Sequence, residues 1–147
     1  MAILYLSLPA AAITELQVVQ NDAARLNAKL PRRAHASPVL QDLHCWPVLQ
    51  RIQFKVLCLI FKAVYKLAPA FVKSRLVFYT PSRILRSSSA ELLIVPRVRK
   101  ARMGGHSFAV LGPELWNDLP ASFSLENNYL LFWKKLKALL FTQAWRQ

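Results

Sequence analysis

The side chains that most often hold a metal ion are three histidines and two cysteines, and their spacing does not form a site. They lie at His35, His44, Cys45, Cys58 and His106. A tetrahedral zinc site usually draws its ligands in pairs a few residues apart, and the adjacent His44 and Cys45 point apart. We therefore expect neither a metal nor a cofactor, and we interpret His44 as a packed or hydrogen-bonded structural residue.

Nucleophilic and acid–base catalysis also lack a local arrangement of residues. Ser107 follows His106, but no G-x-S-x-G turn surrounds it. Cys58 lies one helical turn from Lys55 and Lys62, which would lower its thiol pKa, but its apolar neighbours favour a small hydrophobic residue. The seven acidic residues are scattered, with no Asp-Asp or D-x-D pair to hold the cations of polymerase or nuclease chemistry. The sequence therefore predicts a protein that is not an enzyme.

The basic residues, in contrast, are numerous and concentrated. The chain carries 20 lysines and arginines against 7 acidic residues, for a formal net charge of +13. Residues 51–102 contain twelve of the basic residues and one acidic residue, Glu91. Such an excess indicates a polyanionic partner, either a nucleic acid or an anionic membrane surface.

The candidate phosphate-binding residues form three sets in this central third of the chain. At about 100° per residue, a helix places the first set on one arc roughly 60° wide. Its members are Arg51, Lys55, Lys62 and Lys66. The second set lies beside serines and comprises Arg83 and Arg86, and the third comprises Arg97, Arg99, Lys100 and Arg102. A solvated helix face is the other interpretation of the first set, but for the whole surface we favour contact with RNA or DNA.

These side chains must be positioned by a fold that the hydrophobic pattern predicts to be mainly α. A chain of 147 residues, 54% of them hydrophobic, is long enough to bury a core, and we interpret it as a single domain, residues 1–147. We expect a small helical domain with a short β element near residues 91–110. The expected helices span 14–29, 37–44, 47–67, 69–79, 106–117 (interrupted near Gly112 and Pro113) and 126–143. A polar loop at 80–90 precedes short β-segments at 91–95 and 97–103.

Two of these helices are each predicted to bury one apolar stripe. In the first, Thr14 and Gln17 form a capping box, and the buried stripe consists of Leu16, Val19, Ala23, Leu26 and Leu30. Pro47 opens the longest helix, whose core face consists of Leu49, Ile52, Val56, Leu59, Ile60, Ala63 and Leu67. The short helix between them takes Ser37 as its N-cap. The tryptophans at positions 46, 116, 133 and 145 are interpreted mainly as core residues, with stacking on bases as the alternative.

No segment has the composition of a membrane span or of a typical signal peptide. The strongest apolar run, residues 56–61, is bracketed by Lys55 and Lys62 and is far shorter than the ~20 residues that a transmembrane helix needs. The first twelve residues are mildly apolar but lack a positively charged start. We therefore expect no transmembrane segment.

The most distinctive of several short strings in the sequence is Tyr79-Thr80-Pro81-Ser82-Arg83 with Leu85-Arg86-Ser87-Ser88. Together these strings resemble the segment that follows the polymerase domain in non-LTR (LINE-type) retrotransposon reverse transcriptases. The others include Leu16-Gln17-Val18-Val19-Gln20-Asn21, Ser37-Pro38-Val39-Leu40, Phe61-Lys62-Ala63, Leu67-Ala68-Pro69 and Leu115-Trp116-Asn117. Their order and spacing are similar to those of the vertebrate elements over about residues 3–143. The chain departs from the pattern at Cys45-Trp46 and at Gly104–Phe108, where an acidic and a basic residue are replaced.

This resemblance implies descent from a reverse-transcriptase polyprotein. In that family the polymerase palm, with its paired catalytic aspartates, and the endonuclease lie upstream, and neither is contained in these 147 residues. The leading interpretation is a noncatalytic fragment that binds RNA or DNA without sequence preference, in the nucleus or cytoplasm. One alternative is a module that packs against a polymerase domain and self-associates in its absence. Another is an open reading frame with no selected function.

Overall fold

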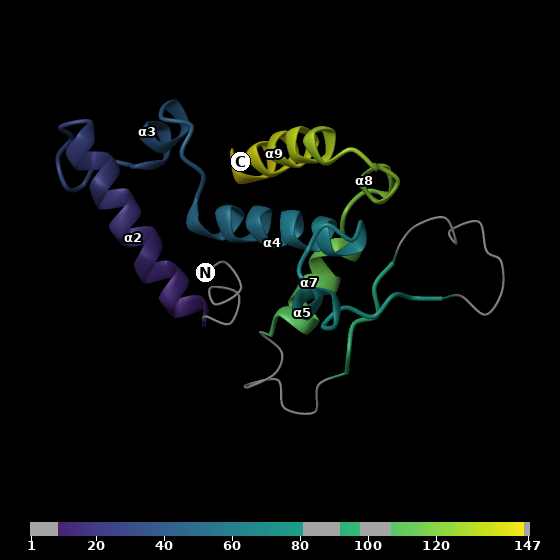
Figure 1. Ribbon diagram of the computed structural model, residues 1–147. Coiled ribbons are helices and arrows are strands. Elements are labelled where there is room, and N and C mark those ends of the chain that lie inside the picture. The colour runs from purple at the N-terminus through teal and green to yellow at the C-terminus, as the bar shows by residue number, and fades with distance from the viewer. Residues whose placement is uncertain (1–8, 81–91, 98–106, 146–147) are drawn as a thin grey trace.

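The computed structural model describes residues 9–80, 92–97 and 107–145, and it confirms a mainly helical fold (Figure 1). The helices are α2 (Ala10–Asn27), α3 (Ser37–Asp42), α4 (Val48–Val64), α5 (Ala70–Lys73), α7 (Phe108–Asn117), α8 (Ala121–Ser124) and α9 (Tyr129–Trp145). Helix α8 was not expected from the sequence. None of the helices in the described part of the chain is long and apolar enough to cross a bilayer.

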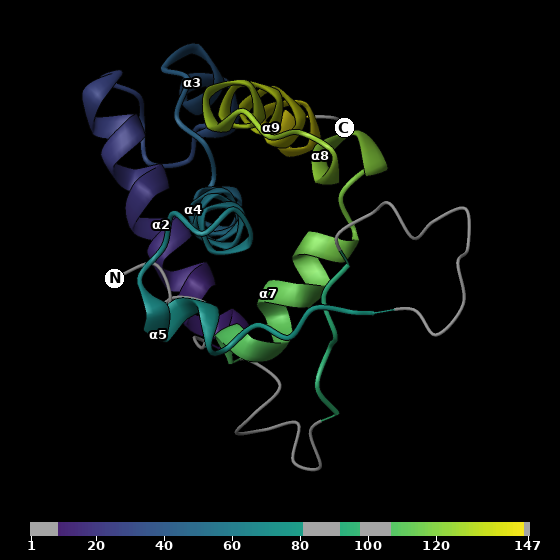
Figure 2. The same cartoon turned by 45° about the vertical axis from the view of Figure 1, so that its right-hand side comes forward.

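Helix α4 is the centre of the fold. It packs against α9, α7, α2 and α5, and the view nearly along its axis shows these helices arranged around it (Figure 2). Eight of its residues are buried, at positions 52, 56–58, 60, 61, 63 and 64. Helix α7 approaches α4 closely at Gly112, where a Cβ atom would lie 3.3 Å from the Cδ1 atom of Ile60. The predicted apolar face of the longest helix is therefore the middle of the core, although its end residues Leu49 and Leu67 are exposed.

An aromatic cluster joins α4 to the three C-terminal helices. The rings of Phe61 and Phe132 are stacked with centroids 4.3 Å apart, and Trp116 and Phe123 each lie 6.0 Å from Phe132. Phe61 and Phe132 have no exposed surface, and Trp116 is 1% exposed. Burial of such large side chains is the main source of folding free energy. The cluster therefore fixes α9 beside α4.

Four helices begin directly after a proline. Pro9, Pro47, Pro69 and Pro120 precede α2, α4, α5 and α8, and all have extended backbone, with ψ between 142° and 154°. Proline has no N–H group to leave unpaired at a helix start, while its carbonyl can accept a bond from the first turn. The Arg51 N–H donates to the Pro47 carbonyl over 3.2 Å. The predicted opening of the longest helix by Pro47 is confirmed.

Three helices end in a Schellman motif without glycine. Lys29, His44 and Lys66 have φ values of 52°, 51° and 61°. At the end of α4, the Leu67 N–H donates to the Lys62 carbonyl and the Lys66 N–H to the Ala63 carbonyl, which is the hydrogen-bond pattern of this motif. The predicted end of the longest helix at Leu67 is therefore wrong: the helix ends at Val64, and Lys66 leaves the predicted cationic arc.

Among the described residues, the β element consists of one isolated bridge. It is an antiparallel bridge between Phe78 and Leu93, in which the Tyr79 N–H donates to Leu92 and the Ile94 N–H to Val77. The predicted helix over 69–79 accordingly ends at Lys73, because the aromatic and β-branched residues that follow suit an extended segment. The Asn117 side chain binds both backbone groups of Leu93, at 3.0 and 2.8 Å. Residues 98–106, which include most of the second predicted β-segment, lie outside the described residues.

Helix α7 and the short α3 also differ from their predicted forms. Helix α7 runs without interruption through the buried Pro113, so the break expected near Gly112 and Pro113 is wrong. Pro113 is the sixth residue of this ten-residue helix, so the helix continues without the hydrogen bond that an N–H at this position would donate to the Ala109 carbonyl. Helix α3 has Ala36 at its N-cap position, not Ser37, and it ends at Asp42.

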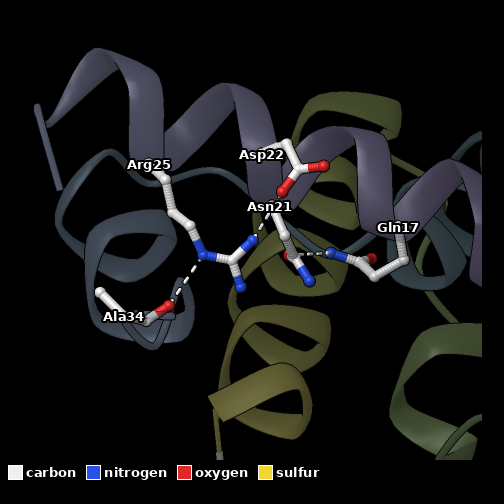
Figure 3. A network of polar contacts seen from close by, with 5 residues as sticks. All are labelled: Gln17, Asn21, Asp22, Arg25 and Ala34. Atoms are coloured by element: carbon white, nitrogen blue, oxygen red, sulfur yellow. Dashed lines mark hydrogen bonds and ion pairs between the residues drawn. The ribbon is translucent and has the colours of Figure 1, made fainter. Parts of the chain in front are cut away.

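Helix α2 corrects two predictions. It begins at Ala10, so Thr14 lies within it and bonds the Ala10 carbonyl, and the capping box does not form. Its predicted stripe is not buried: Leu16, Val19, Ala23, Leu26 and Leu30 are all exposed, and Ala24, which is buried, is not part of that stripe. Of three polar contacts made by α2 side chains, two lie within the helix and one links it to the segment that follows. Figure 3 shows Gln17 bonded to Asn21, and Arg25 bonded to Asp22 and to the Ala34 carbonyl.

Candidate nucleic-acid interface

The structure keeps three of the four arc residues on one helix. Arg51 and Lys55 are exposed on α4, one turn apart. Lys62 is half-buried, with its Nζ atom 4.8 Å from the centroid of the Tyr129 ring. A cation over an aromatic face is attracted by the ring quadrupole. Lys62 is therefore held against α9, whereas Arg51 and Lys55 project into solvent.

The other predicted phosphate-binding residues are not brought to this surface by the described part of the chain. Arg97 is exposed at the end of the extended segment 92–97, beyond the bridge to Phe78. The remaining five lie outside the described residues, namely Arg83, Arg86, Arg99, Lys100 and Arg102. The candidate interface consequently consists of α4 and the elements that pack beside it.

Helix α9 adds cations that were not predicted from the sequence. Lys134 and Lys137 are exposed on α9, and the Nζ atom of Lys137 lies 5.3 Å from the centroid of the Trp133 ring. The sequence feature that could have indicated these cations is the run of lysines at 134, 135 and 137. This run lies far from the basic central third of the chain, so its sequence position does not indicate that it joins the same surface. Helix α9 packs on α4, and Trp133 lines one cavity with Lys55 and Lys62 and another with Lys134 and Lys137.

A groove follows the junction of α4 with α9 and is lined by both cations and aromatic rings. We call it the α4–α9 groove and define it by the residues of three cavities that share lining residues: Trp46, then Arg51, Phe54, Lys55 and Lys62 of α4, and Tyr129, Trp133, Lys134 and Lys137 of α9. A cavity of about 230 Å³ lies between Lys55, Lys62, Tyr129 and Trp133. A second one, of about 400 Å³, lies between His44, Trp133, Lys137 and Phe141. Trp133 borders both cavities.

The local charge of this groove is positive and uncompensated. Of the ion pairs between described residues, one joins Arg25 to Asp22 on α2, and the other joins Lys135 to Glu126 at 2.7 Å. The hydrogen bond from Lys135 holds the pKa of the Glu126 carboxyl below its usual value. Arg51, Lys55, Lys134 and Lys137 have no carboxylate partner among the residues that the structure describes. Their charge is therefore available to a bound anion.

Cys58 and Tyr129 lie at the floor of the groove and do not provide a reactive group. Burial raises the pKa of the Cys58 thiol to about 11, although a hydrogen bond with Tyr129 and the charge of Lys62 act in the opposite direction. Burial also raises the pKa of the Tyr129 hydroxyl. A thiol with so high a pKa stays protonated near neutral pH and is a poor nucleophile. Cys58 is a buried side chain of the core, as its sequence context indicated.

Of the described histidines and cysteines, His44 and Cys45 adjoin in the chain and line one cavity, whereas Cys58 lies in the core. His44 is exposed, and its ring stacks on Phe141 with centroids 6.0 Å apart. Cys45 is exposed, whereas Cys58 is buried. In the parts of the chain that the structure describes, no three His, Cys, Asp or Glu side chains gather closely enough to hold a metal ion.

Comparison with known proteins identifies no match to this chain. No protein-family model matches the sequence, no curated protein matches it, and no solved structure matches it. The function must therefore be inferred from the residues of this chain and their geometry.

Proposed function

We propose that this chain is a noncatalytic nucleic-acid-binding module, and that it is a C-terminal fragment of a LINE-type non-LTR retrotransposon reverse transcriptase. The family proposal rests on the ordered strings quoted from the sequence. The binding proposal rests on one observation: Arg51 and Lys55 are exposed one turn apart on α4, and no described carboxylate pairs with them.

The geometry favours binding through the phosphate backbone. Helix α4 is fixed by eight buried residues, so the positions of its exposed cations are constrained by the core. Lysine and arginine side chains contact phosphates without reading base identity. Release of condensed counterions then drives the association, which makes it dependent on salt and independent of sequence.

Charge reversal tests this proposal. The double variant Arg51→Glu/Lys55→Glu should bind a short oligo-dT strand more weakly than the unaltered chain. The slope of log K against log salt should also become shallower, by about 0.7 for each phosphate that the variant no longer neutralises. We would measure both by fluorescence anisotropy between about 50 and 200 mM salt, the range over which such contacts are most visible.

The matched control is Lys73→Glu/Arg75→Glu. Both residues are exposed in and after α5, outside the α4–α9 groove, and the net charge changes by the same amount. The control should retain most of the affinity and the slope. Equal losses of affinity in both variants, or no loss in the α4 variant when its helicity is unchanged, would contradict the proposal.

The exposed apolar stripe of α2 favours a second candidate function, that of a module that packs against a polymerase domain. Leu16, Val19 and Leu26 are 38%, 66% and 79% exposed and lie at helical spacing. Large exposed apolar patches on a protein often mark a surface that a partner covers. In this case Leu16→Gln/Val19→Gln should remove self-association measured by light scattering, while nucleic-acid binding should not change.

A further inference from the structure

The aromatic side chains of the α4–α9 groove form a connected row that reaches the surface. The rings of Trp46 and Phe54 meet edge-on with centroids 5.0 Å apart, and those of Phe54 and Trp133 meet edge-on at 5.8 Å. All three are half-buried. Part of each side chain is therefore held by the protein, and part remains accessible to a ligand.

Cations border this row on both sides. Arg51 and Lys55 line a cavity of about 350 Å³ together with Trp46 and Phe54. Lys134 and Lys137 line the neighbouring cavity with Trp133. No aspartate or glutamate among the described residues lines either of these cavities. The groove thus combines positive charge at its edges with aromatic surface between them.

We infer that the α4–α9 groove binds single-stranded nucleic acid by stacking unpaired bases on this aromatic row, with Trp133 as the main platform. The inference rests on the proposed function and specifies its substrate class. Proteins that bind single strands without sequence preference combine a positive groove for the backbone with aromatic side chains for the bases. Trp133 is central because it borders two of the cavities and is partly exposed.

A duplex can contact the cations of this groove but not its aromatic rings. In a duplex, the faces of the bases are covered by their neighbours, so half-buried aromatic rings have no base face to contact. The duplex would be bound only through its phosphates, by the exposed lysines and arginines. The structure therefore indicates a preference for single strands that depends on aromatic residues, in addition to an attraction to both forms that depends on charge.

The test compares Trp133→Leu with the unaltered chain on oligo-dT and on a duplex of the same length. Alanine substitution of a stacking aromatic residue typically costs ~1–3 kcal/mol per base. We therefore expect the affinity for oligo-dT to fall by about 5- to 150-fold, with an unchanged salt slope and unchanged duplex affinity. Tyr79→Leu, at an exposed aromatic residue outside the groove, should bind both ligands normally.

A second variant separates stacking from folding, because Trp133 also packs against the core. Trp133→Phe keeps an aromatic face and should restore most of the affinity for oligo-dT. Equal affinity of the unaltered chain for the two ligands would overturn the inference, as would normal binding of oligo-dT by a folded Trp133→Leu variant. Neither result would affect the proposed function, which is tested separately by the α4 charge reversal and its Lys73→Glu/Arg75→Glu control.

Discussion

Helices α2 and α4 are 18 and 17 residues long, and both carry apolar residues at helical spacing. Their environments nevertheless differ. Helix α4 buries eight residues beneath α7 and α9, whereas α2 buries Ala24 alone and exposes Leu26 to 79%. The same apolar periodicity is therefore found in a buried helix and in an exposed one, because a helix buries its apolar stripe only where another element covers it.

Two hydrogen bonds attach α2 to the start of α4 and to the residue Trp46 that precedes it. Gln17 accepts a hydrogen bond from the Val48 N–H at 2.8 Å, and Gln20 donates one to the Trp46 carbonyl at 2.8 Å. A typical hydrogen bond contributes only about 1 kcal/mol net. We therefore expect α2 to open at a lower free energy than α4, whose stability comes from the aromatic cluster.

Core truncation should give the largest difference between the two regions. Phe132→Ala removes a fully buried ring that contacts Phe61 and should lower the free energy of unfolding by about 3–5 kcal/mol. Leu26→Ala, on the exposed face of α2, should change it by less than about 0.5 kcal/mol. Urea denaturation measures both. If Phe132→Ala does not fold, Ile60→Val should still cost about 0.5–1.5 kcal/mol. Similar effects at Leu26 and Ile60 would contradict the comparison.

Glycine substitutions at the ends of α2 and α4 should raise the free energy of local or global unfolding, by less than core truncation lowers it. Lys66→Gly relieves a positive φ at the end of α4 and should stabilise the global fold by about 0.5–1 kcal/mol. Lys29→Gly relieves the same strain in α2, but its effect should be confined to amide exchange within α2. Lys66→Ala controls for removal of the charge and should bring no such gain. Equal global stabilisation by the two glycines would show that α2 and α4 unfold together.

The two cysteines should report the difference through their reactivity. Cys45 is exposed, and Cys58 of α4 is buried with a pKa of about 11. At pH 8 we expect the exposed Cys45 thiol to react rapidly with a disulfide reagent, and the buried Cys58 thiol to react only on unfolding. Because the Cys58 thiol in the unfolded chain ionises near its ordinary value of 9.0, the folded state holds more protons between pH 9 and 11. The Cys58 contribution to stability should therefore fall as pH rises through this range. Rapid reaction of both thiols would contradict the burial of α4.

The sequence predicted the parts of the fold that depend on local chemistry. Pro47 marked the start of α4, and the period of its apolar residues identified the core face. The end of α4 was not predictable, since Lys66 adopts a conformation that usually requires glycine. Periodicity identified the apolar face of α2 but could not show that nothing in the described chain covers Leu26.

The candidate site was predictable only in its α4 part. Arg51, Lys55 and Lys62 share one helix, so their spacing placed them together. Trp133 and Lys137 join them only because the aromatic cluster packs α9 on α4, and this contact between residues far apart in the chain leaves no local pattern.

Photocrosslinking to a bromouracil-substituted single strand tests the central claim most directly, because it maps the contact surface on the unaltered chain. Irradiation of the complex followed by peptide mass spectrometry identifies the residues in contact with the bases. The account predicts crosslinks to α4 and α9, concentrated at Phe54 and Trp133 of the α4–α9 groove, and their disappearance when unlabelled oligo-dT competes. Crosslinks confined to α2, or spread evenly over the basic residues without the aromatic row, would contradict it.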